Sequence, residues 1–251
     1  MKSAHYTLCR EEVMAKFSPG KAMTAFFVFF FPILIYLGSW QVSRGIEKQV
    51  IVDRHFSNKS LPTIDEIELD GLQKNFKEYR SIRLNGTYEN ETYILDNRLY
   101  RQEAGYEIFT KFKTVRDNIF LVNRGWISKE NFNYSDEVAI HNEIVSAQGI
   151  LSPFNRFGLD LTSAESENYW PKYVQELDYS KAKSDLGPSL NSFVLQLSAG
   201  SVGSLEPIWK PTEVKPSRHY GYAVQWFGLA LVLISSFVYF GLKGDKNELS
   251  K

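Results

Sequence analysis

The sequence is short of cysteine, and its charge has no excess of either sign. Cys9, in the N-terminal tail, is the only cysteine among 251 residues, so the rest of the chain has no disulfide, cysteine-ligated zinc site or Cys-x-x-Cys pair. Lysine plus arginine number 29, as do aspartate plus glutamate, which gives a formal net charge of zero. Binding to nucleic acid needs a clustered positive excess, so this balance argues against a nucleic-acid partner.

The sequence also lacks the short motifs of common enzyme families. It contains no Walker loop and no G-x-G-x-x-G, H-E-x-x-H or G-x-S-x-G pattern. Histidine occurs at four scattered positions, none with a partner at metal-ligand spacing: His5, His55, His141 and His219. We therefore predict that the protein is not an enzyme.

Two apolar stretches, one near each end of the chain, stand out against this background. No charge occurs at 22–43, where 22–37 is almost wholly apolar, or at 220–242, whose 23 residues make about 34 Å of helix at about 1.5 Å per residue. Because a bilayer core of about 30 Å needs about 20 apolar residues, each run can span it. A cleaved signal peptide is the alternative for the first run, although Leu37-Gly38-Ser39-Trp40 is a poor cleavage site.

The predicted organisation is a two-pass membrane protein with one central domain. Short basic tails favour cytoplasmic termini with the domain on the other side, since a long domain can cross regardless of its charge. The predicted boundaries are an N-terminal tail at 1–21, transmembrane helices at 22–40 and 219–242, an external domain at 41–218 and a C-terminal tail at 243–251.

The first helix contains Pro32, which either kinks a spanning helix or is absorbed by neighbouring packing. Val42, Ile46 and Val50 recur every four residues and predict that the helix continues towards Asp53. A break is expected at 58–62.

Within the domain, apolar residues alternate with polar ones, which is typical of strands. Strands are predicted at Tyr79–Tyr88, Thr92–Leu99, Tyr106–Lys113, Ile119–Ile127, Glu143–Leu151 and Ser192–Leu197. Turns are predicted at Glu89-Asn90, Ala104-Gly105 and Asp117-Asn118, and a helix at Asp178–Leu186. The predicted fold class is α+β: two transmembrane helices flank one domain with a mainly antiparallel, meander-like sheet and few short helices.

The first of three distinctive motifs, Gly38-x-Trp40-Gln41-x-x-Arg44, ends the first apolar run. Trp40 fits an interfacial anchor and Arg44 a snorkelling base, which is ordinary chemistry at a membrane boundary. The alternative is that this pair positions a ligand or a partner helix.

The second motif, Asn123-Arg124-Gly125-Trp126, ends a predicted strand. It fits a strand-end bulge in which glycine relieves the backbone and tryptophan packs into the core. Arg98 is expected nearby. Arg98 and Arg124 on one sheet face could bind carboxylates such as heme propionates, or simply pair with Asp and Glu.

The third motif opens the second apolar run. Helical spacing places four residues on one face: His219, Tyr222, Ala223 and Trp226. A histidine beside aromatics at the membrane surface could ligate heme iron, or be a solvated interfacial residue. A separate small-residue stripe, Gly221, Gly228 and Ser235, would permit close approach of another helix, plausibly the first.

These three motifs and Gly105-Tyr106, in this order and between two apolar runs, resemble the Surfeit locus protein 1 family of cytochrome oxidase assembly factors. The resemblance covers the whole architecture of the chain. There are departures: Glu47-Lys48 stands where many members have Trp-Lys, and Lys111 and Ser128 stand where proline is frequent. The short, acid-containing N-terminal tail lacks a mitochondrial presequence, so the chain is similar to bacterial members.

The resemblance implies assembly of a heme–copper cytochrome c oxidase, with heme a passed to subunit I and heme a synthase as a further possible partner. It implies that His219 is the candidate ligand of heme iron, with Trp40, Tyr222 and Trp226 lining the ring and Arg44 nearby. It also implies the bacterial inner membrane with a periplasmic domain; the mitochondrial inner membrane is the alternative. Two rival functions are a membrane-anchored scaffold that holds an oxidase intermediate without touching heme, and an enzyme that modifies heme, for which the sequence shows no redox or acid–base site.

Overall fold

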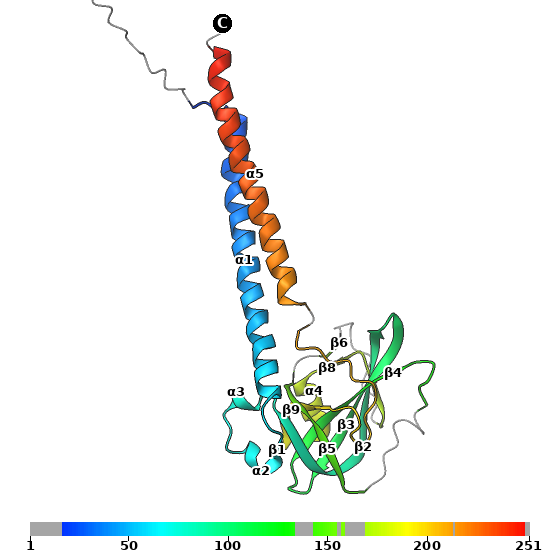
Figure 1. Cartoon of the computed structure of the whole chain (residues 1–251). Coiled ribbons are helices and arrows are strands. Elements are labelled where there is room, and N and C mark those ends of the chain that lie inside the picture. Colours follow the sequence, from blue (N-terminus) through cyan, green and yellow to red (C-terminus); the bar gives the residue numbers. More distant parts are fainter. Residues whose placement is uncertain (1–16, 134–142, 155–156, 159–168, 213, 249–251) are drawn as a thin grey trace, which may run out of the picture. The chain divides into compact units, whose positions relative to one another are not determined.

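The computed structural model describes residues 17–133, 143–154, 157–158, 169–212 and 214–248 (Figure 1). The predictions that concern Cys9, His5 and His141 lie outside these residues. The chain divides into two compact units, one drawn from 1–49 and 214–251 and the other from 50–213. We call them the helix-pair unit and the barrel unit.

The helix-pair unit consists of the long helix α1 (Lys21–Lys59), up to residue 49, and of α5 (Pro216–Glu248). α5 extends beyond the predicted span of 219–242 at both ends. α1 passes through Pro32 without a break and extends beyond Asp53 to end at Lys59. The two helices run antiparallel: the rings of Phe27 and Phe237 stack at 4.3 Å, and Ser18 donates to the carbonyl of Gly241. The prediction that the first helix extends beyond the apolar run is confirmed.

Two buried glycines of α1 allow the helices to approach closely. A Cβ placed on Gly38 would lie 2.6 Å from the Phe227 ring, and one on Gly45 would lie 2.6 Å from the Tyr220 ring. Aromatic side chains of α5 therefore fill notches in α1 that only glycine provides, which is the usual role of small residues in membrane helix pairs.

The expected contact of the stripe formed by Gly221, Gly228 and Ser235 with the first helix is wrong. A Cβ on Gly221 or Gly228 would meet nothing within 4 Å, whereas Ala223 and Ala230 are each only 3% exposed. The close approach is made by glycines of α1 against large side chains of α5, so the buried face of α5 lies elsewhere on its surface.

The barrel unit is built on a closed ring of strands (Figure 1). Neighbours in the ring are hydrogen-bonded in the order β2, β3, β4, β9, β5 and back to β2. All these pairs are antiparallel except β4 with β9, which is parallel. The ring consists of β2 (Ser81–Tyr100), β3 (Glu103–Thr114), β4 (Ile119–Ser128), β5 (Val145–Pro153) and β9 (Leu190–Leu197).

Short elements surround this ring. β1 (Ile64–Asp65) and β7 (Lys172–Val174) each pair in parallel with β2, and β6 (Phe157–Gly158) pairs with β8 (Glu176–Leu177). The remaining helices are α2 (Glu66–Leu69), α3 (Lys74–Lys77) and α4 (Tyr179–Leu186). A mixed α/β content with a mainly antiparallel sheet is therefore confirmed, and closure into a barrel is a feature that the sequence pattern did not predict.

Buried side chains on the ring strands form two main hydrophobic clusters: Tyr88, Phe112 and Phe120 belong to one, and Tyr93 and Phe109 belong to the other, which also includes residues of α4. Fully buried aromatics include Tyr88 and Tyr93 of β2 and Phe109, Phe112 and Phe120 of the following strands. Such side chains bury large apolar areas, and burial of apolar surface is the main favourable contribution to folding. Because β4 is buried along nearly its whole length, the period of two read from the sequence marks only part of the core.

The predicted turn at Glu89-Asn90 is wrong, because β2 runs on through these residues. The register with β3 shifts between Tyr88 and Thr92, which is how a bulge lets a long strand bend around a barrel. Lys111 of β3 pairs with the two glutamates that flank Asn90, at 2.6 Å to Glu89 and 2.9 Å to Glu91. Polar residues that resemble a turn are thus held in the sheet by a cation on the adjacent strand.

The predicted turn at Ala104-Gly105 is also displaced. β3 already includes both residues, and the chain reverses at Arg101 and Gln102, which have positive φ of 50° and 71°. The turn at Asp117-Asn118 is confirmed, with Asp117 at φ 64°. Neither arginine nor glutamine is a typical residue for positive φ, so sequence signals could not place the first of these turns.

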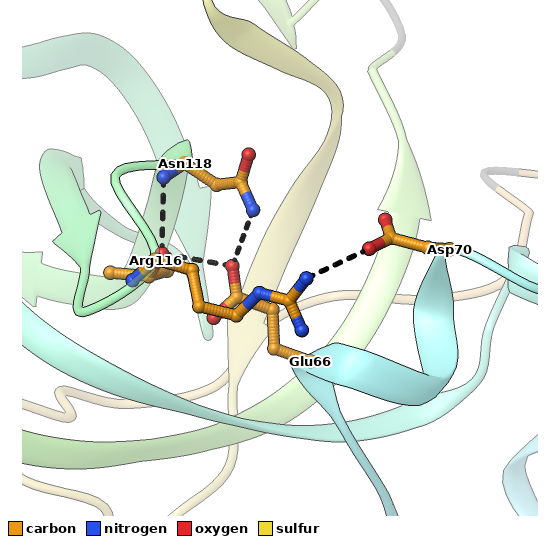
Figure 2. A network of polar contacts seen from close by, with 5 residues as sticks. Glu66, Asp70, Arg116 and Asn118 are labelled. Carbon is orange, nitrogen blue, oxygen red and sulfur yellow. Dashed lines mark hydrogen bonds and ion pairs between the residues drawn. The ribbon is translucent and has the colours of Figure 1, made fainter.

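A polar network fastens α2 to the turn between β3 and β4 (Figure 2). Glu66 is only 8% exposed, and its Oε1 accepts hydrogen bonds from Thr114 Oγ1 at 2.8 Å and from Asn118 Nδ2 at 2.7 Å. On the surface, Arg116 pairs with Asp70 at 3.2 Å. The buried carboxylate is therefore satisfied by neutral donors, and the network holds a short helix that could not persist by itself.

Candidate functional site

The helix-pair unit contains a polar contact between its two helices. His219 of α5 and Gln41 of α1 meet with 2.9 Å between Nδ1 and Oε1. An amide oxygen only accepts hydrogen bonds, so in this contact Nδ1 carries the proton, and a neutral imidazole then keeps its lone pair on Nε2. The contact thus favours the tautomer whose Nε2 can bind a metal ion.

The other ring nitrogen of His219 has no hydrogen-bond partner among the described residues. Nε2 is buried and makes no hydrogen bond with any residue that the structure describes. A buried polar atom without a partner costs free energy and is unusual in folded proteins. Metal-binding histidines have the same arrangement, with one ring nitrogen hydrogen-bonded and the other left for the metal. His219 and Gln41 therefore fit the binding of a heme iron at Nε2.

The aromatic residues predicted around His219 differ in exposure. Trp40 and Tyr222 are 44% and 46% exposed, and Trp226 is half-buried. Ala223 is buried, so the face predicted to carry four residues together is split between the helix contact and the outside. Large exposed rings on apolar helices can face lipid or a planar ligand.

Arg44 lies one turn beyond Gln41 on α1 and is half exposed. Its guanidinium pairs with Glu47 at 2.7 Å and lies 5.8 Å from the centre of the Trp40 ring. Glu47 is the residue that replaces tryptophan in the departure noted above. The charge of Arg44 is thus balanced within its own helix, and its guanidinium lies near an aromatic ring.

The barrel unit holds the second motif in a strand-end bulge, as predicted. Gly125 has a φ of +119°, and the register places Gly125 opposite Ile108 but Asn123 opposite Phe109, so Arg124 is the extra residue. A Cβ on Gly125 would also lie 2.6 Å from the carbonyl oxygen of Glu206. Glycine is therefore required at this position both by backbone conformation and by space.

A buried carboxylate, Glu107, organises the residues around this bulge. It is 2% exposed, accepts a hydrogen bond from Asn123 Nδ2 at 2.6 Å and pairs with Arg98 Nε at 2.7 Å. Asn123 in turn accepts from the Gly125 amide at 3.1 Å. Sequence reasoning missed Glu107; an acidic residue within an otherwise apolar strand segment was the signal that could have found it.

Trp126 joins the bulge to the neighbouring hairpin. Its indole Nε1 donates to the carbonyl of Arg98 at 2.8 Å, and its ring occupies the space that a Cβ on Gly105 would need. Tyr106 packs on Phe132, with ring centroids 4.8 Å apart. The Gly105-Tyr106 pair and the Asn123–Trp126 motif therefore form one structural cluster.

Arg98 lies beside the motif as predicted, but the two arginines do not converge. Arg124 Nε donates to the carbonyl of Gly203 at 2.7 Å, and its guanidinium lies 6.0 Å from the Tyr88 ring. Arg98 instead pairs with Glu107. The suggested joint carboxylate site of these two arginines is therefore not formed, and pairing within the protein is the outcome for both.

No group of three or more His, Cys, Asp or Glu side chains is placed to hold a metal ion among the residues that the structure describes.

A family model described as the SURF1 family matches residues 28–231. A SURF1-like protein of Rickettsia prowazekii is 31% identical over 217 residues, which cover 83% of this chain and 85% of the relative. A SURF1-like protein of Rickettsia conorii is 30% identical over 228 residues, which cover 86% and 90%.

Proposed function

Because the chain belongs to the SURF1 family, generally linked to oxidase assembly, we propose that it is a membrane-anchored assembly factor that binds heme a and helps insert it into subunit I of a heme–copper cytochrome c oxidase. Heme a synthase is the proposed donor. The observation that carries the heme proposal is the buried, unpartnered Nε2 of His219 opposite its contact with Gln41.

Exposure of the two long helices supports a membrane position. In the most apolar 18-residue stretch of each helix, only 6% is buried in α1 and 17% in α5. A core helix of a soluble protein would be mostly buried, whereas here large side chains such as Phe29 and Leu231 are 63% and 66% exposed. Exposed apolar surface of this extent is stable in a bilayer and unfavourable in water.

Contacts of α1 with α5 argue for retention of the first helix. Phe27 stacks on Phe237, and Gly38 receives Phe227. Cleavage ahead of Trp40 would remove both contacts. We therefore propose that both helices cross the bacterial inner membrane, with cytoplasmic termini and a periplasmic barrel unit.

The motif residues of the helix-pair unit have distinct roles in the proposed binding of heme. His219 Nε2 would supply an axial nitrogen to the iron of the cargo heme once the atoms that cover it move aside. Gln41 holds the proton on Nδ1 and fixes the imidazole ring. Trp40, Tyr222 and Trp226 offer aromatic faces to the macrocycle, and Arg44 supplies a cation at the edge of the apolar region.

The test is an optical spectrum of the full-length protein purified in detergent after expression with a heme a supply. Wild type is expected to carry heme a, and His219→Ala is expected to lose it. Gln225→Ala is the matched control, because Gln225 is an exposed residue of the same helix. Equal heme content in wild type and His219→Ala would overturn the role of His219.

A scaffold function is the second candidate, and the barrel unit supports it. The cluster around Asn123–Trp126 satisfies its own charges through Glu107, Arg98 and the carbonyl of Gly203. If the protein is a scaffold, His219→Ala retains oxidase activity in cells, and disruption of the Asn123–Trp126 bulge abolishes it. If it is a carrier, His219→Ala lowers oxidase activity even though the protein accumulates normally.

A further inference from the structure

A cleft lies beside the bulge in the barrel unit. Its volume is about 180 Å³, and its lining includes the end of β2, β3, β9 and the segment that follows the barrel. The polar and aromatic side chains that matter are Arg98, Glu107, Gln196, Trp209 and Lys210. All of them belong to the barrel unit.

Arg98 brings more hydrogen-bond donors to this cleft than its partner can accept. Its Nε lies 2.7 Å from Glu107 Oε2, and a guanidinium has five N–H donors, of which one carboxylate takes at most two. Glu107 also accepts from Asn123 and is the one acidic side chain among the described residues of the lining. Glu206 lies close by but bonds the hydroxyl of Tyr100. Donors on Arg98 therefore remain for a further acceptor.

Gln196 of β9 brings a side-chain amide to the lining of the cleft. Its side chain is only 8% exposed, it faces the cleft, and its amide makes no hydrogen bond within the part of the chain that the structure describes. Lys210 and the indole N–H of Trp209 likewise have no partner there. Neither amide atom of Gln196 is fully buried, so the amide is open to the cleft and its N–H groups can donate to an acceptor there.

We propose that this cleft binds a carboxylate, with Arg98 and Lys210 supplying the charge and Gln196 a hydrogen bond. The lining carries two cations against the one carboxylate of Glu107, and a planar guanidinium matches a carboxylate in a forked pair. About 180 Å³ is below the roughly 300 Å³ at which pockets for drug-sized ligands begin, so the cleft takes one acidic group on a short chain and excludes a porphyrin. This binding does not depend on the proposed function.

The carboxylate can come from a free small acid or from an acidic side chain of a polypeptide, and two probes distinguish these sources. The full-length ¹⁵N-labelled protein in detergent is titrated with succinate and, separately, with N-acetylglutamate α-amide. N-acetylglutamine α-amide, which has the same shape without the charge, is the control. The indole N–H signal of Trp209, assigned by Trp209→Phe, reports binding.

We expect a saturable shift of the Trp209 signal with at least one carboxylate and none with the neutral analogue. Tighter binding of succinate identifies a free acid, and tighter binding of the glutamate amide identifies a polypeptide side chain. Lys210→Gln and Gln196→Met are each expected to weaken binding about tenfold or more, because a charge-assisted hydrogen bond contributes about 1.5–3 kcal/mol. These variants leave the Arg98–Glu107 pair intact and so test binding without loss of folding. A signal that does not saturate with either carboxylate, or that moves equally with the neutral analogue, would overturn the proposal.

Discussion

Gln41 holds the Nδ1 proton of His219, so the imidazole is oriented before any ligand arrives. We expect Gln41→Leu, which preserves size but removes the acceptor, to weaken heme a binding by about tenfold to a hundredfold, as is typical when the hydrogen-bond partner of a ligating histidine is lost. Gln41→Glu keeps an acceptor and should retain binding. Spectrophotometric titration with heme a measures the affinity.

A second readout separates orientation from packing. In the absence of heme, ¹⁵N chemical shifts of the His219 ring should show the Nδ1–H tautomer in wild type and in Gln41→Glu, and a mixture in Gln41→Leu. An unchanged tautomer and an unchanged affinity in Gln41→Leu would show that the contact has no positioning role.

Asn123 is expected to matter for stability. Asn123→Ala removes one donor to the buried Glu107 and the acceptor of the Gly125 amide, which should lower the free energy of unfolding by about 1–3 kcal/mol. Asn131→Ala, at an exposed asparagine, is the control. Thermal unfolding of the full chain, followed by tryptophan fluorescence, measures the difference. Equal midpoints for the two variants would contradict the structural role of Asn123.

Tyr88 gives the barrel unit a dependence on alkaline pH. Burial raises the pKa of the Tyr88 phenol to about 12, although the nearby Arg124 opposes this. The unfolded chain ionises this phenol near pH 10, so its contribution is constant below pH 10 and is lost as pH rises through 12, by about 2 kcal/mol at that pH. Tyr88→Phe should reduce this loss, while Tyr169→Phe, at an exposed position, should not. The free energy of unfolding of each variant is measured between pH 9 and 12. An equal dependence on pH in Tyr88→Phe and Tyr169→Phe would contradict the assignment.

The sequence motifs located many of the site residues, but the spacing within each motif did not show which contacts those residues make. Gly38, Gly105 and Gly125 are each required by a close contact with a residue distant in the sequence, so the motif alone could not show why glycine is needed there. The partner of His219 could not be predicted, because Gln41 and His219 are 178 positions apart and meet only when the helices pair. Glu107 was missed because a buried charge depends on partners from other strands.

At the scale of elements, the α1–α5 pair depends on notches in one helix. Gly38→Leu would place side-chain atoms where the Phe227 ring lies, so we expect the helices to separate and the thermal midpoint to fall by several degrees. Gly228→Leu is the matched control, because a Cβ there meets nothing within 4 Å and leucine favours helix over glycine. Unfolding in detergent compares the two. A larger loss in Gly228→Leu would contradict the packing described.

The elements themselves were mostly predictable, and their pairing was not. Alternation placed the strands, and the predicted helix at Asp178–Leu186 is found as α4, where Asp178 is the N-cap and accepts from the Lys181 amide at 2.8 Å. Parallel pairing of β4 with β9 joins segments about 70 residues apart and leaves no local signal. The polar residues around Asn90 resemble a turn in sequence. Only the structure shows that Lys111 pairs with both Glu89 and Glu91 and so holds this segment in the sheet.

At the scale of the whole molecule, the proposed topology places both termini in one compartment and the barrel unit in the other. Cys9 reports the N-terminal tail, and Cys9→Ser combined with Ser250→Cys or Asn131→Cys reports the C-terminal tail or the domain. In intact spheroplasts a membrane-impermeant maleimide should label position 131 and neither tail. Labelling of all three positions alike would contradict a two-pass topology.

The ring of strands has a consequence for synthesis. β9 is the one strand that joins β4 to β5, and it ends at Leu197, late in the chain. A ribosome that stops before residue 190 would release a polypeptide with two unpaired sheet edges, and such edges are templates for aggregation. Premature stop codons upstream of this point should therefore yield inclusion bodies or degradation. Loss of α5 alone would leave all strands of the ring in place.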